Sequence, residues 1–140
     1  MILYINTIKD NAEKIDLRII NNDKVIVKKE LSARAQQAEK LIPAISKVLA
    51  KAKIDLKEIK KITVENFGGS FTSLRIGVAT ANALAYSLCI PVEGINKTKI
   101  ANCNINVVEP IYSKNPDITV SKKLFNNWNN TAVDYMLKKQ

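Results

Sequence analysis

The stretch "FGGSFTSLRIG", residues 67–77, follows a short apolar run and leads into a long, nearly uncharged segment with helical spacing. Gly68 and Gly69 permit a tight turn, and the hydroxyl of Ser70 suits a helix N-cap. Free N–H groups at a helix start also attract anions, so a phosphate site is the alternative. The chain has only four glycines, and they form neither a Walker A loop nor a GxGxxG fingerprint. We therefore favour a structural turn, whose helix-start motif is Gly68, Gly69, Ser70, Phe71 and Thr72.

The flanking sequence predicts a βββαβαβ order of elements. Short apolar or alternating runs indicate strands at residues 2–5, 15–19, 25–28, 61–66 and 90–94. The segment "NND", residues 21–23, supplies a hairpin turn between the second and third strands. Periodic apolar positions indicate helices at about residues 34–52 and 70–88, and a final helix is expected from about Val120. This order predicts an α/β lobe with a mixed five-stranded sheet, as in ribonuclease-H-like and actin-like proteins.

The helix expected at residues 34–52 is amphipathic. Its charged face carries Glu39, Lys40, Lys47 and Lys51. Its apolar stripe comprises Ala38, Leu41, Ile42, Ile45, Val48, Leu49 and Ala52. We expect this stripe to pack on the sheet, because one apolar face is what a surface helix buries.

The helix expected at residues 70–88 is apolar on two sides and carries no charge after Arg75. At about 100° per residue, one face contains Leu74, Val78, Ala81, Ala85 and Leu88, and the other contains Ile76, Ala79, Ala83 and Ile90. One sheet covers only one of these faces. The small residues of the second face would let another helix approach closely, so we expect a protein partner there. The alternative is an overlying segment of the same chain, such as the region around Trp128.

The composition favours a protein of a reducing compartment. The formal net charge is +9, but only three of the 22 basic residues are arginines, and the lysines are dispersed. Solvated lysine faces are therefore favoured over a dedicated nucleic-acid surface. Cys89 and Cys103 are expected to be reduced thiols. The first residues lack the basic lead of a signal peptide, and the uncharged run at 76–92 is too short to span a membrane. We expect a cytoplasmic location and no membrane contact.

The sequence gives little support for catalysis. It contains no histidine, which excludes histidine zinc sites and Ser-His-Asp triads. The first strand ends at Asn6, where ribonuclease-H-like enzymes place a metal-binding acid. Glu65 and Glu93 lie near the ends of other strands, but two carboxylates without a central third one are weak support for a two-metal site. We expect no catalytic residue, no metal and no cofactor.

In the stretch "FGGSFTSLRIGVATANALAYSLCIPV", residues 67–92, the sequence resembles the bacterial TsaB (YeaZ) family, whose members are accessory subunits for making threonylcarbamoyladenosine in tRNA. The family pattern GPGSFTGLRIG is matched except at Phe67, Gly68 and Ser73. "ILYINT" is similar to the family's ILAIDT, with Asn6 in place of Asp, and "ARAQQAEKLIPAI" is similar to its first helix. The likeness covers residues 1 to about 94, and "PIYSKNPDI" resembles a later PxYxR-like segment. The chain looks like a shortened member, with a lobe at 1–95 and an extension at 96–140 that replaces most of a second lobe and packs on the same domain.

The resemblance implies a non-catalytic scaffold with an actin-like lobe. In the family, two helices of this lobe dock the catalytic paralogue TsaD to give a heterodimer. Related contacts can give homodimers, and the ATPase TsaE joins the complex. Contact with tRNA is expected to be weak or indirect. The interface expected from this likeness, and from the second apolar face, is Arg75, Ile76, Ala79, Ala83, Tyr86, Gln37, Lys40 and Ala44. Arg75 is expected to be free to meet an acidic group. The alternatives are a self-associating structural protein and, less favoured, a nucleic-acid-binding or hydrolytic ribonuclease-H-like protein.

Overall fold

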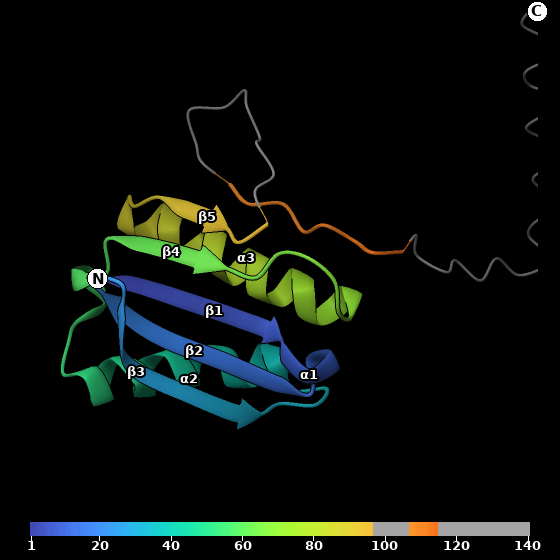
Figure 1. The fold of residues 1–140 in the computed structure, drawn as a ribbon, viewed down its shortest axis with the longest axis horizontal. Helices are drawn as coiled ribbons and strands as arrows, with labels where there is room; N and C mark the ends of the chain where they lie inside the picture. The colour runs from blue at the N-terminus through green and yellow to red at the C-terminus, as the bar shows by residue number, and fades with distance from the viewer. Residues whose placement is uncertain (97–106, 115–140) are drawn as a thin grey trace, which may run out of the picture.

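The computed structural model describes residues 1–96 and 107–114, and the order of its main elements confirms the predicted pattern (Figure 1). The strands are β1 (Ile2–Ile8), β2 (Lys14–Asn21), β3 (Lys24–Ser32), β4 (Lys61–Val64) and β5 (Val92–Gly94). The helices are α1 (Lys9–Ala12), α2 (Gln37–Ala52), the 3₁₀ turn η1 (Leu56–Glu58) and α3 (Phe71–Leu88). No helix in these two ranges has both the length and the hydropathy needed to cross a membrane. The helix predicted from about Val120 and the Trp128 region lie outside the described residues.

The five strands form one mixed sheet in the order β3-β2-β1-β4-β5. β1 pairs antiparallel with β2, and β2 pairs antiparallel with β3, whereas β4 lies parallel to both β1 and β5. The predicted hairpin turn is confirmed at Asn22 and Asp23, which have φ values of 46° and 61°. Asn and Asp tolerate this left-handed conformation better than most residues, so a two-residue turn can join β2 to β3.

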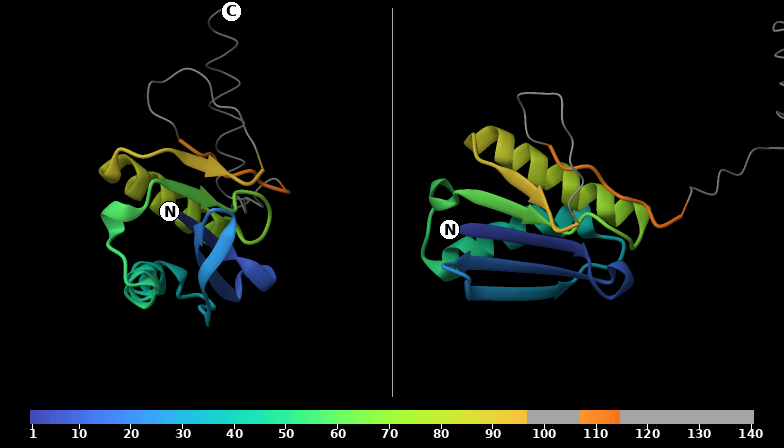
Figure 2. Two further views of the ribbon diagram at one scale, coloured as in Figure 1. Left: turned by 60° about the vertical axis from the view of Figure 1, so that its left-hand side comes forward. Right: turned by 45° about the horizontal axis from the view of Figure 1, so that its top comes forward.

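One face of the sheet carries the hydrophobic core. Leu3 on β1 pairs with Ile19 on β2 and with Ile62 on β4, and all three side chains are fully buried. Both α2 and α3 lie over this face (Figures 1 and 2), as right-handed crossovers to β4 and then β5 require. The helices thus form one layer and the sheet a second, which leaves the outer side of the helical layer uncovered by other described elements.

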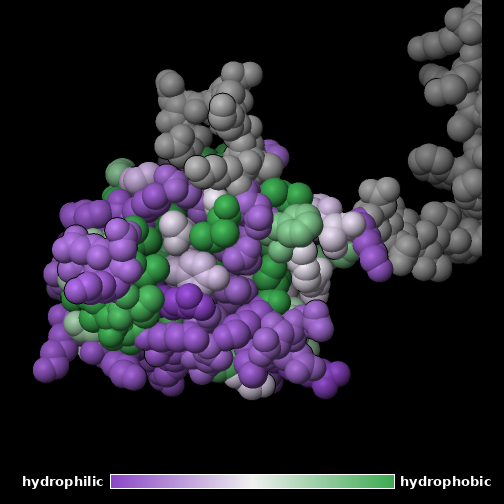
Figure 3. Space-filling view, viewed as in Figure 1, coloured by the Kyte–Doolittle hydropathy of each residue, from purple (hydrophilic) through white to green (hydrophobic). Residues whose placement is uncertain are grey.

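The opposite face of the sheet is largely hydrophilic (Figure 3). Asp16 is buried on this face, where it accepts a hydrogen bond of 2.6 Å from Nη2 of Arg18. The Arg18 guanidinium also lies 4.9 Å from the centroid of the Tyr4 ring. Ion pairs and a cation–π contact therefore satisfy the charged groups here, and this face is suited to solvent.

The short element α1 was not predicted from the sequence. Asp10, Asn11 and Ala12 all have positive φ, between 50° and 68°, so the chain makes a left-handed turn between β1 and β2. Such a turn carries no apolar period that a pattern could reveal. It orients the carbonyl of Ala12 toward α2, where the side-chain amide of Gln37 donates a hydrogen bond to it.

Candidate functional site

The turn at the start of α3 requires its two glycines. Gly68 has φ of 80° and Gly69 has φ of 69°, both in the region that disfavours side chains. A Cβ on Gly69 would also lie 2.7 Å from the Cβ of Ile8. Ser70 caps the helix, because its Oγ accepts a hydrogen bond of 3.3 Å from the N–H of Ser73, as predicted.

The same turn is not laid out as an anion cradle. The N–H of Gly68 donates a hydrogen bond of 3.2 Å to the carbonyl of Ile111, and the cap uses the N–H of Ser73. Two of the main-chain donors that would meet a phosphate are therefore engaged inside the lobe. These contacts fit the interpretation of residues 68–72 as a structural turn at the start of a helix, rather than as a phosphate site.

The two faces of α3 are arranged as the sequence predicts at most positions, but Leu88, expected to be buried, and Ile90, expected on the outer side, are both half-buried. Leu74, Val78, Ala81 and Ala85 are buried against the sheet, with exposed fractions of 3% or less. Ala79 and Ala83 are exposed on the other side, and Tyr86, at 72%, is the most exposed large apolar side chain of the described residues. Ile76 is half-buried and packs against the edge of the core. The outer side of α3 is therefore a surface of small side chains that a helix can approach closely.

The neighbouring helix α2 is rotated relative to the expectation. Gln37 and Ala44, expected at a partner interface, are buried, with exposed fractions of 5% and 2%. Neither is accessible to a partner in this arrangement, so both assignments are corrected. Ala38 and Ile42, expected to face the sheet, are exposed instead. The physical reason is that the buried arc is centred on Leu41, and the side chain of Gln37 is held inward by its bond to Ala12.

Ala38 of α2 and Ile76 of α3 line a shallow hollow between the first turns of the two helices. Its volume is about 520 Å³, and Arg34, Thr72 and Ser73 also line it. Lys40, expected at the same interface, lies instead on the β3 side of α2, where it is half-buried and its Nζ donates a hydrogen bond of 3.0 Å to the carbonyl of Ser32. This hollow, together with Ile42, Ala79, Ala83 and Tyr86, makes up the candidate surface, which we call the helical face.

Arg75 is not free, contrary to expectation. Its Nε donates a hydrogen bond of 2.6 Å to the phenol oxygen of Tyr112, and its guanidinium lies 5.4 Å from the centroid of that ring. The Tyr112 ring also packs on Phe71, with centroids 4.7 Å apart. Arg75 stays exposed at the border of the helical face, but its first partner is this tyrosine rather than a carboxylate.

Tyr112 belongs to an extended segment, residues 107–112, which we call the strap. Asn82 of α3 binds the main chain of Val108 twice: its Oδ1 accepts from the N–H and its Nδ2 donates to the carbonyl, both at 2.9 Å. The carbonyl of Asn66 accepts a hydrogen bond of 2.7 Å from the N–H of Ile111. The strap (orange in Figure 1) thus runs along the flank of α3.

Asn66 and Asn82 are the structural residues that sequence reasoning missed. Asn66 is fully buried after β4, and its amide nitrogen donates to the carbonyls of Asn96 and Glu109 at 3.1 Å. In the sequence Asn82 stands between two alanines, which is a weak signal, whereas Asn66 follows the charged Glu65 and gives none. Their acceptors are main-chain groups far away in the chain, which no local pattern identifies.

The polar residues expected at the strand ends have separate partners. β1 continues past Asn6 to Ile8, so Asn6 lies within the strand rather than at its end. Asn6 accepts a hydrogen bond of 2.9 Å from the N–H of Ile8. Glu65 accepts one of 3.1 Å from Asn96, whereas Glu93 pairs with Lys61 at 2.6 Å. Within residues 1–96 and 107–114, no three His, Cys, Asp or Glu residues gather in a way that could hold a metal ion. The geometry on this side of the lobe supports structural roles for these carboxylates.

Comparisons with known proteins agree with this geometry. The family model described as TsaD, tRNA N6-adenosine threonylcarbamoyltransferase, matches residues 25–121. The chain is similar to the tRNA threonylcarbamoyladenosine biosynthesis protein TsaB of Buchnera aphidicola (subspecies Schizaphis graminum), with 36% identity over 77 residues, or 55% of this chain and 37% of that protein. It is also similar to TsaB of Bacillus subtilis, with 27% identity over 90 residues, or 64% of this chain and 39% of that protein.

The tRNA N6-adenosine threonylcarbamoyltransferase of Christiangramia forsetii is 39% identical over 67 residues, which cover 48% of this chain and 19% of that protein. The solved structure of YeaZ from Pseudomonas aeruginosa aligns with a TM-score of 0.61 and 21% identity, over 67% of this chain and 42% of that one. The structural likeness establishes the ribonuclease-H-like, actin-like fold of the lobe. The chain spans less than half the length of each relative.

Proposed function

Because this chain belongs to the TsaD family and, within it, to the TsaB (YeaZ) proteins, we propose that it is a non-catalytic subunit for tRNA threonylcarbamoyladenosine biosynthesis that docks a TsaD-like catalytic paralogue. The proposed docking surface is the helical face. Since the two TsaB relatives are matched over 37% and 39% of their lengths, both the pathway and the partner are proposals for this shorter span.

The observation that carries the proposal is the exposed small-residue side of α3. Ala79 and Ala83 are exposed on a helix whose opposite side is buried in the core. Alanines at successive turns allow helices to approach more closely than large side chains do. Ile42, at 49% exposure, and Tyr86 add apolar area on either side. This combination is typical of a surface that another helical layer covers.

A scaffold role also agrees with the contacts of Asn6 in β1. Asn6 stands where a metal-binding acid would be needed, and its side chain is engaged by the N–H of Ile8 and by the Tyr4 hydroxyl. Burial is the main cause that raises the pKa of Tyr4, so this phenol stays protonated as a hydrogen-bonding group. These contacts support positioning within the lobe rather than metal-assisted phosphoryl chemistry.

The test is the association of the purified chain with the TsaD-like protein of the same organism, before and after Ala83→Arg. A buried unpaired arginine should cost about 2–5 kcal/mol of binding free energy, which would raise the dissociation constant at least about 30-fold. Thermal unfolding near wild type would show that the lobe is intact. The matched control is Val25→Arg, because Val25 is a half-exposed apolar residue on the far edge strand.

Three outcomes separate the possibilities. Loss of binding in Ala83→Arg alone supports the proposed docking surface. Wild-type binding by a folded Ala83→Arg variant overturns the helical face as the interface. No association of the wild-type chain with the TsaD-like protein, together with self-association that Ala83→Arg abolishes, favours the self-associating structural protein instead. Association is measured by light scattering, which also tests the expected homodimer and, with a TsaE-like ATPase added, its recruitment.

A further inference from the structure

β3 forms an open edge of the sheet, because it pairs with β2 on one side and no other described strand lies beyond it. The N–H of Ala33 donates to the carbonyl of Glu13, which makes these two residues a hydrogen-bonded pair. Such pairs alternate along an antiparallel ladder. In the register of β2 and β3, Lys29 and Leu31 therefore bond to β2, whereas the main-chain groups of Lys28 and Glu30 point outward.

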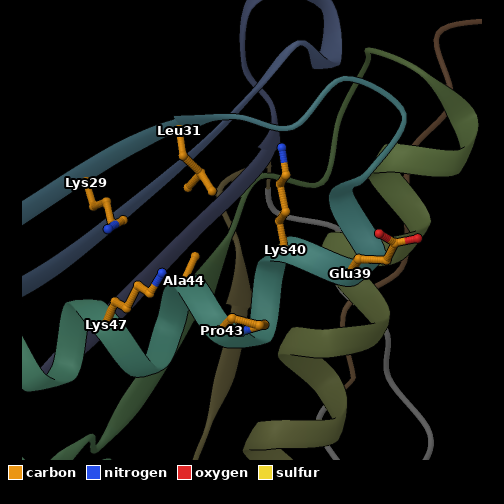
Figure 4. Close-up of a pocket in the computed structure, with 7 residues that line it drawn as sticks. All are labelled: Lys29, Leu31, Glu39, Lys40, Pro43, Ala44 and Lys47. Carbon is orange, nitrogen blue, oxygen red and sulfur yellow. The ribbon is translucent and has the colours of Figure 1, made fainter.

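A groove of about 340 Å³ runs beside this edge, between β3 and α2. Its lining residues are Lys29, Leu31, Glu39, Lys40, Pro43, Ala44 and Lys47. Figure 4 shows Lys29 and Lys47 reaching toward each other from opposite walls, and Lys40 reaching from α2 toward β3. Glu39 is directed away from these lysines. We call the open edge of β3 and this cavity together the β3 groove.

The β3 groove carries positive charge that the described residues do not neutralise. Neither Lys29 nor Lys47 forms an ion pair with any carboxylate in the part of the chain that the structure describes. Lys40 donates a hydrogen bond to the carbonyl of Ser32, a neutral group. Leu31, Ala44 and Pro43 supply apolar contacts between the charges. The groove thus combines main-chain hydrogen-bonding groups, apolar contacts and a local excess of lysine.

We propose that the β3 groove binds an extended acidic peptide segment of a partner protein, which adds to the sheet as a strand beside β3. A sheet edge needs a ligand that both donates and accepts main-chain hydrogen bonds, and a peptide does so. A nucleic-acid backbone offers phosphate acceptors but no matching donors. Carboxylates on one side of the added strand would point at the lysines, which gives the charge complementarity for an acidic sequence.

The spacing of the lysines fits this mode of binding. Lys40 and Lys47 are seven residues apart on α2, or about 10.5 Å along the helix axis. Alternate side chains of a strand repeat every 6.7 Å or so, and three of them span about 13 Å. Two or three acidic residues in every second position can therefore meet Lys40, Lys29 and Lys47 in turn. The β3 groove lies on the β3 side of α2, shares no residue with the helical face and does not depend on docking there.

The experiment is a fluorescence-anisotropy titration of the full chain with a labelled peptide of alternating Glu and Thr. An otherwise identical peptide of alternating Lys and Thr is the ligand control. The double variant Lys29→Glu/Lys47→Glu should raise the dissociation constant at least about tenfold by placing like charges opposite the peptide. The matched protein control is Lys57→Glu/Lys60→Glu, which changes net charge equally at exposed sites outside the groove.

A second variant tests strand addition itself. Lys28→Pro removes an outward N–H, and proline is tolerated on an edge strand when that group faces solvent. It should abolish peptide binding while thermal unfolding stays cooperative. Hydrogen exchange should show that the peptide newly protects the amides of Lys28 and Glu30, whereas those of Lys29 and Leu31 are protected beforehand.

Several results would overturn the proposal. One is equal affinity for the acidic and basic peptides, and another is unchanged binding by the folded Lys29→Glu/Lys47→Glu variant. An oligouridylate that displaces the peptide at equal charge would identify a general polyanion site. A concentration-dependent dimer with protected β3 amides in the absence of peptide would assign the edge to a second copy of the chain.

Discussion

Gly77 of α3 lies directly against Thr7 of β1, with no room for a side chain between them. A Cβ built on Gly77 would overlap the Thr7 hydroxyl and lie 3.2 Å from its methyl group. The same hydroxyl donates a hydrogen bond of 2.6 Å to the carbonyl of Ser73, one turn earlier in α3. Thr7 therefore fixes both the distance and the orientation of α3 on the sheet, and with them the direction in which Ala79 and Ala83 point.

Gly77→Ala is expected to destabilise the lobe, although alanine favours helices more than glycine does. The overlap with Thr7 should cost about 1–3 kcal/mol, against a gain in helix propensity of about 1 kcal/mol. Chemical denaturation measures the net loss. Thr7→Ala/Gly77→Ala is the matched control, because the new methyl group then occupies the space that Thr7 leaves. If the two changes are simply additive, the contact between them is not what requires the glycine.

The strands and the inward side of α3 could be predicted because their signals are local. Leu3 and Ile5 form a short apolar run, and Leu74 and Val78 repeat at helical spacing, so period alone indicates their burial. The turn at Asn22 follows equally directly from residue type. For these elements, what the chain prefers locally and what the core requires agree.

The rotation of α2 could not be obtained in the same way. Its apolar stripe is wide enough that Ala38 and Ile42 were expected to face the sheet, but a polar residue, Gln37, occupies the buried arc instead. Gln37 is tolerated there because the carbonyl of Ala12 accepts its hydrogen bond. That carbonyl is oriented by the left-handed turn of α1, which is a tertiary feature without a sequence period. The contact of Arg75 with Tyr112 could not be predicted for a related reason, since 37 residues separate them in the sequence.

Glu30 should make the stability of the lobe depend on pH below neutrality. Hydrogen bonds from Lys28 and Lys9 lower the pKa of Glu30 from its ordinary 4.5 to about 2. A carboxylate with a lowered folded-state pKa stabilises the fold above its unfolded pKa, and this contribution is lost as the pH falls through the folded value. The melting temperatures of wild type and Glu30→Gln should therefore differ at neutral pH and converge between pH 4.5 and about 2.

The matched control for this titration is Glu39→Gln, because Glu39 forms no ion pair with any residue of the described ranges. It removes one carboxylate elsewhere on the lobe, so a change common to both variants reflects net charge rather than the contacts of Glu30 with Lys9 and Lys28. The effect of Glu30 itself should be modest and should shrink with added salt, since its side chain is about one third exposed, at 32%. A Glu30→Gln profile parallel to wild type down to pH 2 would contradict the assignment.

Asn82→Ala should release the strap from the flank of α3. The side chain of Asn82 exchanges two hydrogen bonds of 2.9 Å with the main chain of Val108, and Val108 is buried, at 7% exposure. Losing both bonds should lower the free energy of unfolding by about 1–3 kcal/mol, because each neutral bond contributes about 0.5–1.5 kcal/mol. The amide of Val108 should exchange with deuterium markedly faster, which is the direct measurement.

Tyr112→Phe is the matched control, since it removes the bond to Arg75 but keeps the ring on Phe71. It should leave the Val108 amide protected. An unchanged exchange rate for Val108 in Asn82→Ala would mean that the contacts of Ile111 and Tyr112 alone hold the strap in place.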